Sequence, residues 1–165
     1  KAMSYNNYLD ANSALELAKE FSEPDVAIIK HNNPCGVALG TTPVEAYVTA
    51  RETDPVSAFG GVLAFNRPVD LAAAKEITST FVEVVIAPSF ASDALAELKR
   101  KKDLRLLEVG PLAATSPEGY DLKKLVGGLI VQDRDLGRIQ DLKALRVPTV
   151  RQPTEDEYDT GGFAW

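Results

Sequence analysis

Cysteine and histidine are almost absent from this sequence, which contains one of each in 165 residues. A single cysteine forms no internal disulfide, and one Cys with one His cannot supply the three or four N/S ligands of a usual zinc site. Any metal would have to bind through carboxylates or carbonyls. We therefore expect a protein without internal disulfides and without a zinc site built from cysteine and histidine.

Long apolar runs and an excess of positive charge are also missing. No run approaches the roughly 20 apolar residues that cross a bilayer, and residues 1–7 lack the character of a signal peptide. Asp and Glu total 24 against 18 Lys and Arg, so the net charge is -6 and no broad basic face is available for nucleic-acid phosphates. We expect a cytoplasmic protein that binds neither membranes nor nucleic acids.

What the chain does contain is typical of a folded, soluble domain. Hydrophobic residues make up 45% and charged residues 25% of the sequence. A chain of this length buries about 70% of its surface in one compact core. We predict a single domain over residues 1–165.

Helical and apolar extended segments alternate along the first two thirds of the chain. Apolar spacing predicts a helix over 12–21, with Asn12 or Ser13 as its cap, and Thr42 and Asp70 have the position of caps for two later helices. Such alternation predicts an α/β domain with a largely parallel sheet. The expected helices are 12–21, 41–52, 70–80 and 93–102, and the expected strands are 25–30, 60–66, 81–88 and 103–109.

The last third of the chain has a weaker pattern. Residues 110–125 are rich in turn formers and are interpreted as an excursion, while 127–135 and 145–150 are predicted as strands. Residues 153–165 begin like a helix but include Gly161 and Gly162, which cost about 1 kcal/mol each inside one.

The only histidine follows a lysine at the end of an expected buried strand, and Lys30-His31 is the first candidate site. Asn32, Asn33 and Pro34 are placed to end the strand, and the chain is predicted to open into a loop in which Gly36 permits a tight turn. Ligands in open α/β sheets bind at strand carboxyl ends. A base beside a cation suits deprotonation of a weak nucleophile and stabilisation of the anion that follows. The alternative is a histidine that caps a strand end and a solvated lysine.

Three other stretches are candidates, each with a structural alternative. Phe59-Gly60-Gly61 could stack on a flat ligand or form a turn into a strand. The adjacent amides Asn6-Asn7 could bind a heterocycle or make a turn or cap. Glu83 interrupts an apolar stretch and must find a partner, a ligand or an edge.

Known phosphate and deaminase motifs are not present. The sequence lacks G-x-x-x-x-G-K-[ST] and G-x-G-x-x-G, which leaves a nucleoside triphosphate or dinucleotide cradle unsupported. Cys35 in NPCG has no second cysteine after it, and His31 is not followed by x-Glu, so zinc deamination is rejected.

Five stretches, taken together and in order, resemble one known family. They are SYNN at 4–7, KHNNPCGVA at 30–38, TDPVSAFGGVLAFN at 53–66, FVEVVIAP at 81–88 and GGLIVQDRD at 127–135. From Lys1 to about Pro153 the chain resembles the first half of the AICAR transformylase domain of the bifunctional purine-biosynthesis enzymes that also carry IMP cyclohydrolase.

This resemblance implies a fold and a reaction. The fold would be a three-layer α/β/α, cytidine-deaminase-like unit with a mostly parallel sheet and no zinc site, the first of two in tandem. The reaction would be formyl transfer from 10-formyltetrahydrofolate to the 5-amino group of AICAR, giving FAICAR, and it would require no metal. The missing second half and a homodimeric partner would complete the folate site.

The resemblance also implies roles for residues at matching positions. His31 would accept the proton of the attacking amine, and Lys30 would stabilise the transition state. Reduced folate would bind beside Phe59. Gly60, Glu83 and Asn7 would contact the AICAR nucleotide.

Three departures from the family pattern limit what this chain is expected to do alone. The upstream phosphate-binding segment is missing before Lys1, and the second half is missing after Trp165. DTGG at 159–162 puts a family helix in doubt, so 154–165 is interpreted as an atypical, truncated segment. We expect the isolated chain to be inactive or nearly so.

Two alternatives to catalysis stay open. A non-catalytic scaffold that keeps the fold for dimerisation would be favoured by exposed apolar surface near Phe163 and Trp165. A zinc-independent nucleoside deaminase is the more distant one.

Overall fold

The computed structural model describes residues 2–112, 119–137 and 139–165. It divides the chain into two compact units, Lys1–Ser116 and Pro117–Trp165, where the sequence analysis predicts a single domain. Residues 113–118 of the expected excursion over 110–125 lie outside the described residues.

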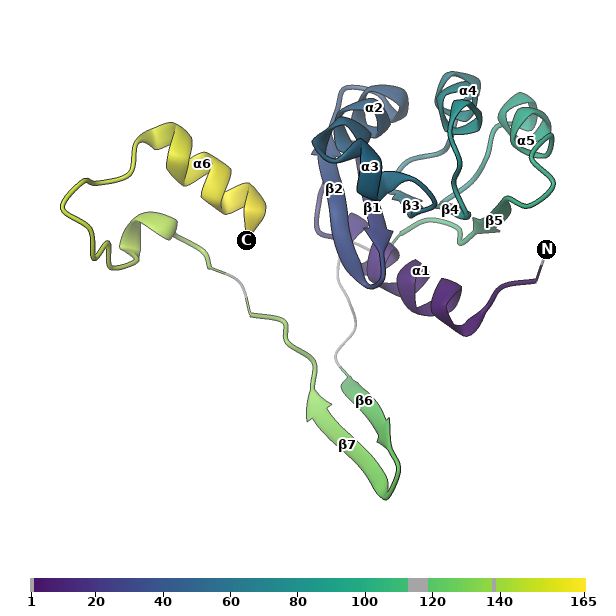
Figure 1. The fold of residues 1–165 in the computed structure, drawn as a ribbon. Helices are drawn as coiled ribbons and strands as arrows, with labels where there is room; N and C mark the ends of the chain where they lie inside the picture. The colour runs from purple at the N-terminus through teal and green to yellow at the C-terminus, as the bar shows by residue number, and fades with distance from the viewer. Residues whose placement is uncertain (1, 113–118, 138) are drawn as a thin grey trace. The chain divides into compact units, whose positions relative to one another are not determined.

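A five-stranded sheet in the order β2-β1-β3-β4-β5 forms the centre of the first unit (Figure 1). β1 pairs with both β2 and β3 in antiparallel fashion, whereas β3–β4 and β4–β5 are parallel, so β1 alone runs against the other four. The prediction of an α/β fold with a mostly parallel sheet is confirmed. The strands are β1 Asp25–Lys30, β2 Asn33–Leu39, β3 Val62–Phe65, β4 Val84–Ala87 and β5 Arg105–Glu108.

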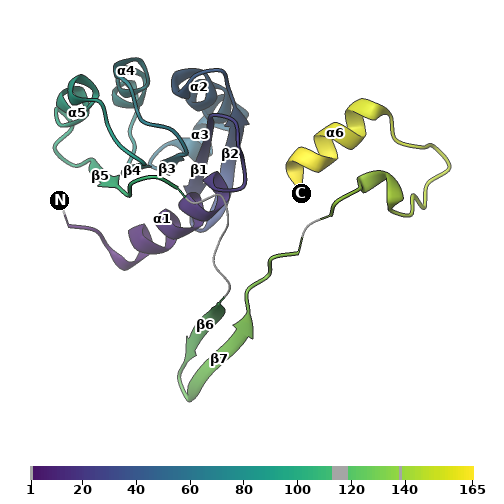
Figure 2. The same cartoon turned by 180° about the vertical axis from the view of Figure 1, so that it is seen from behind.

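Helices cover both faces of this sheet, as Figures 1 and 2 show from opposite sides. α1, Tyr5–Ala18, packs its alanines on one face, where alternate residues of β1, β3 and β4 meet them. The intervening residues of the same strands point to the opposite face and pack against α2, α4 and α5. The remaining bounds are α2 Pro43–Thr53, α3 Pro55–Ala58, α4 Leu71–Ser79 and α5 Ser92–Leu98.

Side-chain caps explain where three of these helices begin. Thr42 and Asp70 cap α2 and α4 as predicted, with Pro43 in the first turn of α2. The prediction that Asn12 or Ser13 caps the first helix is wrong. Ser4 is its cap, in a reciprocal pair of hydrogen bonds with Asn7, and the helix therefore begins a full two turns earlier.

The chain after Lys30 reverses into a strand rather than the loop that the sequence analysis predicts. Lys30 pairs with Asn33 across a two-residue turn, and β2 continues to Leu39 with Cys35 as an extra residue in the pairing. Gly36 lies within this strand, not in a turn. A Cβ there would stand 2.0 Å from the Ala50 carbonyl oxygen, so glycine allows α2 to pack directly on β2.

The sequence analysis places Glu83 inside a strand over 81–88. In the structure Glu83 lies just before the strand, because β4 begins at the next residue. Its backbone N–H donates to the Gly61 carbonyl. The carboxylate therefore lies at the amino end of β4, where it is partly exposed to solvent.

The second unit contains the antiparallel hairpin β6 Tyr120–Leu125 and β7 Gly128–Asp133, a 3-10 turn at Leu142–Ala144, and α6 Glu155–Ala164. The strand predicted at 127–135 is confirmed, but residues 145–150 form no strand. The doubt about a helix through DTGG is also resolved. α6 is continuous across both glycines, starting from a capping box between Thr154 and Glu157.

No helix in the described part of the chain is long and apolar enough to cross a membrane.

Candidate functional site

The candidate residues of the sequence analysis lie along one edge of the five-stranded sheet, the edge that is formed by the ends of its strands. Lys30 is at the carboxyl end of β1, while Gly60 and Glu83 come just before β3 and β4. β1 is antiparallel to β3, so its carboxyl end meets the amino ends of the other strands. The expected strand-end position is therefore right for β1, but for β3 and β4 the site is at the amino end.

Lys30 connects β1 to the segment that precedes β3. Its Nζ donates a 2.7 Å hydrogen bond to the carbonyl of Phe59. An ammonium group has three donors, so this bond leaves two for other partners. Lys30 is half-buried, and the bond to Phe59 holds its ammonium group at this end of β1.

His31 and Asn32 form the turn between β1 and β2, and both have a left-handed backbone. Their φ angles are 55° and 61°, the conformation that a two-residue hairpin loop requires. The left-handed region costs non-glycine residues roughly 1 kcal/mol each. Asp10 on α1 accepts a 2.8 Å hydrogen bond from the Asn32 N–H, and the Asn33 side chain donates to the His31 carbonyl at 2.9 Å. These bonds hold the turn and leave the His31 side chain exposed.

Gly60 adopts a conformation that side chains rarely tolerate, with φ +75°. Its N–H donates to the Phe81 carbonyl at 2.8 Å. A Cβ at this position would also stand 3.3 Å from the Phe81 ring. A ligand at Gly60 therefore meets its Cα or its carbonyl rather than its N–H.

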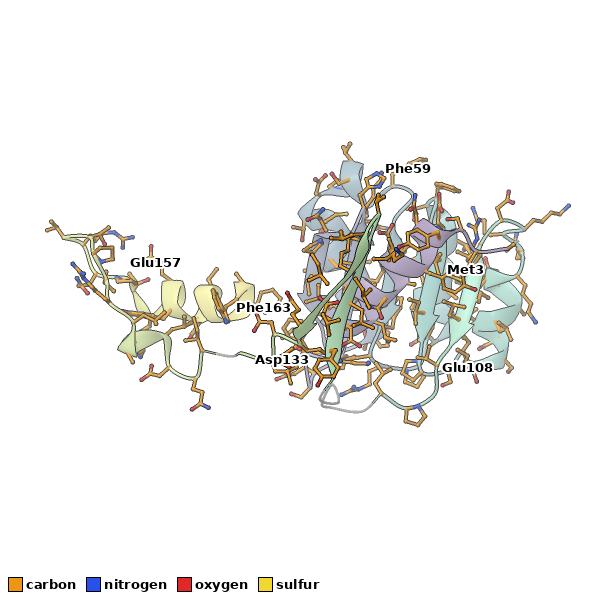
Figure 3. All side chains as sticks on the ribbon, turned by 90° about the horizontal axis from the view of Figure 1, so that it is seen from below. Met3, Phe59, Glu108, Asp133, Glu157 and Phe163 are labelled. Carbon is orange, nitrogen blue, oxygen red and sulfur yellow. The ribbon has the colours of Figure 1, made fainter. Side chains whose placement is uncertain are left out.

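Phe59 and Phe81 form an aromatic pair beside a cavity of about 520 Å³. Their ring centroids are 5.2 Å apart, and Phe59 is 60% exposed. Figure 3 shows Phe59 and Glu108 at opposite edges of the first unit. Lys101, Lys102 and Asp103 line the cavity together with apolar side chains, so its apolar part suits an aromatic ligand.

Asn7, Glu83 and Arg105 form a second group at the same edge, on the side of α1. Asn7 Nδ2 donates a 2.8 Å hydrogen bond to Glu83 Oε2, and Arg105 Nη1 lies 3.7 Å from the same oxygen. Asn7 is buried, and its Oδ1 accepts the Ser4 N–H at the helix cap. One amide thus caps α1 and anchors the carboxylate.

Side-chain hydrogen bonds join Lys30 to Phe59 and Asn7 to Glu83, and backbone hydrogen bonds from Gly60 and Glu83 join the segments that precede β3 and β4. His31 follows Lys30 along the chain, but no hydrogen bond or ion pair among the described residues joins its imidazole to another candidate. Sequence reasoning missed two members of the site, Phe81 and Arg105. A charge inside the apolar stretch 103–109 is the one signal that could have indicated Arg105.

Two groups near the hairpin turn, Asp54 and Cys35, have shifted pKa values. A hydrogen bond from Ser57 lowers the pKa of Asp54, and the Lys30 ammonium lowers it further. Burial raises the pKa of the Cys35 thiol, and the Lys30 charge opposes this rise with a smaller effect. Cys35 is thus a thiol rather than a reactive thiolate. Among the described residues no group of three or more His, Cys, Asp or Glu side chains is placed to hold a metal ion.

Comparison with solved structures gives distant likenesses. Acinetobacter baumannii RibD is 18% identical, with a TM-score of 0.46, and the match covers 60% of this chain and 35% of that one. The dCMP deaminase of cyanophage S-TIM5 is 12% identical, with a TM-score of 0.48, over 65% of this chain and 100% of that one. Both are too distant to carry an assignment.

Family-level comparison covers the whole sequence. The family model described as the AICARFT/IMPCHase bienzyme matches residues 1–165, the same relationship that the five ordered stretches indicate. The chain belongs to the AICARFT/IMPCHase bienzyme family.

Proposed function

We propose that this chain supplies half of the active site for formyl transfer from 10-formyltetrahydrofolate to the 5-amino group of AICAR, giving FAICAR. The family match supports a role in purine biosynthesis. The observation that carries the finer assignment is the gathering of Lys30, Gly60 and Glu83 at one sheet edge beside an exposed histidine.

The proposed chemistry divides between His31 and Lys30. The amine nitrogen attacks the formyl carbon, and a new C–N bond forms as the amine proton passes to the His31 imidazole. The bond from the formyl carbon to N10 of the folate then breaks, and His31 returns the proton to the leaving nitrogen. Lys30 stabilises the negative charge on the formyl oxygen between these steps. General-base assistance of this kind contributes about 10²- to 10⁴-fold to the rate.

The two substrates would approach the sheet edge from different sides. AICAR would lie over Glu83, Asn7 and Gly60, and reduced folate would stack beside Phe59, with the Phe59–Phe81 cavity as its extension. We assign the first unit to a three-layer, cytidine-deaminase-like half-domain. It would work in a cytoplasmic homodimer with a second half that completes the folate site.

The backbone of the hairpin turn supports a role for His31. Two consecutive non-glycine residues in the left-handed region are strained, and strain of this kind gathers at functional sites. Here it places the imidazole at the tip of a short turn that is tied to α1 through Asp10.

The test is an assay of formyl transfer by the full-length protein, in which the appearance of tetrahydrofolate is measured. His31→Ala is expected to reduce kcat by about 10²- to 10⁴-fold, because it removes the base. Added imidazole is expected to restore part of the lost rate. Asn12→Ala, a change at an exposed position on α1, is the matched control and is expected to keep wild-type activity.

Two outcomes would overturn the proposal. Wild-type protein that releases no tetrahydrofolate in the presence of both substrates would remove the formyltransferase assignment. Full activity in His31→Ala would remove His31 as the base while leaving the reaction in place.

One observation favours a second candidate, a non-catalytic half-domain that serves dimerisation. Phe163 is 42% and Trp165 75% exposed, and the β6–β7 hairpin is exposed throughout. On one face of that hairpin, cross-strand pairing groups Leu122 with Val131 beside Tyr120 and Leu129. Sedimentation separates the two candidates: a dimer without transferase activity supports the second, and a dimer with activity supports the first.

A further inference from the structure

Arg105 is the charged residue of the site that neither the sequence nor the family resemblance assigns. It begins β5, with a side chain only 10% exposed. Its guanidinium donates to the backbone carbonyls of Ala2 and Glu83 and lies 3.7 Å from Glu83 Oε2. At that last distance the two groups form an ion pair but no hydrogen bond. Arg105 is therefore held by the backbone, at a fixed place beside the Glu83 carboxylate.

The two oxygens of Glu83 have different surroundings. Oε2 accepts the Asn7 amide and faces Arg105, whereas Oε1 accepts no hydrogen bond from the described residues. The Glu83 side chain is 39% exposed, so it remains partly open to solvent. One oxygen is anchored from two elements, α1 and β5, and the other is left for a ligand.

The charge balance of this pair limits the ligand's chemistry. A carboxylate beside a guanidinium has little net charge, so neither a phosphate nor an ammonium group gains much from it. A neutral group with adjacent hydroxyl donors gains most, because a carboxylate oxygen accepts hydrogen bonds at two lone pairs. The vicinal diol of a ribose is such a group, and carboxylates bind ribose hydroxyls in other nucleotide sites.

We infer that Arg105, together with Asn7, is a positioning residue that holds Glu83 so that Oε1 accepts the ribose hydroxyls of the nucleotide. This inference rests on the proposed function, since it names the part of AICAR that Glu83 binds. Arg105 does not touch the ligand. Its effect passes through the orientation of Glu83.

The experiment compares the binding of AICAR and of its 2′-deoxy and 3′-deoxy analogues to the full-length protein by calorimetry. We expect wild type to bind at least one deoxy analogue about tenfold more weakly than AICAR, the cost of a lost hydrogen bond to a charged acceptor. In Arg105→Met the ratio of the two dissociation constants, that of the analogue over that of AICAR, is expected to fall from about ten to about two. Arg105→Lys, which keeps the charge, is expected to recover part of the discrimination.

The ratio within one preparation does not depend on how much of a variant is folded, so a merely structural role of Arg105 would not move it. In a Glu83→Gln background, Arg105→Met is expected to change the ratio no further, because both residues act through one carboxylate. Arg100→Met is the matched control. Arg100 is an exposed arginine paired with Glu97, and its loss is expected to leave the ratio unchanged.

An unchanged ratio in Arg105→Met, or equal binding of all three nucleotides by wild type, would overturn the inference. No binding of AICAR at all would overturn it as well. Discrimination that depends on Arg105, in a protein without formyl transfer, would support the inference and refute the proposed function instead.

Discussion

Replacing Asp25 with asparagine is expected to stabilise the first unit by an amount that grows with pH. Asp25 begins β1 and is 1% exposed. Neither of its carboxylate oxygens has a hydrogen-bond partner among the described residues, although its backbone N–H donates to Asn66 Oδ1 at 2.9 Å. Burial raises the pKa of this carboxyl from 3.8 to about 8, against a smaller opposing effect of the Arg67 charge.

The sign and size of the effect follow from proton binding. Below pH 3.8 the carboxyl is protonated in both states, and its contribution to stability is fully present. Between pH 3.8 and about 8 only the unfolded chain ionises, so the free energy of unfolding falls by about 1.4 kcal/mol per pH unit. The loss reaches roughly 4 kcal/mol at pH 7 and levels off above the folded-state pKa. Asparagine does not ionise, so Asp25→Asn removes this dependence.

Urea unfolding of wild type and Asp25→Asn between pH 4 and pH 8 measures the effect. The difference in free energy of unfolding is expected to rise from near zero at pH 4 to about 4 kcal/mol at pH 7. Asp93→Asn, at an exposed aspartate of α5, is the control, because its side chain stays in water in both states. Two parallel stability curves for wild type and Asp25→Asn would refute the reasoning, since they would mean that Asp25 ionises as readily in the fold as outside it.

Two further substitutions test the packing that positions the sheet. Gly36→Ala places a Cβ 2.0 Å from the Ala50 carbonyl oxygen, so we expect a loss of about 3 kcal/mol in urea unfolding; a loss below about 0.5 kcal/mol would contradict direct packing of α2 on β2. Asn66→Ala removes three hydrogen bonds of a buried amide, to Asp25, Phe21 and Glu23. We expect a loss of about 3 kcal/mol and a lower Tm in a thermal scan, and an unchanged Tm would show that these bonds contribute nothing net.

Local signals predicted most elements of the first unit. The apolar run at 25–30, the cap at Thr42 with Pro43 after it, and the cap at Asp70 all act within a few residues, and the structure confirms each of them. The start of α1 was missed because Ser4 and Asn7 form their capping pair upstream of the apolar repeat on which the prediction depended.

Predictions failed where a distant contact overrides the local pattern. Residues 33–39 contain proline and glycine and predict a loop, but pairing with β1 makes them a strand, and packing on α2 requires the glycine. The doubt about a helix over 154–165 had a local cause instead: the glycines of 159–162 weigh against a helix, but the capping box at Thr154 and Glu157, also a local signal, starts one.

The sequence by itself determined the α/β class, the mostly parallel sheet and the family, because these depend on periodicity and on motifs that a single chain displays in order. Only the tertiary structure decided which side chains meet. Asn7 reaches Glu83 across 76 residues, and Arg105 reaches the same carboxylate from β5. Such contacts depend on strand order and on β1 running against its neighbours, and neither leaves a periodic trace in the sequence.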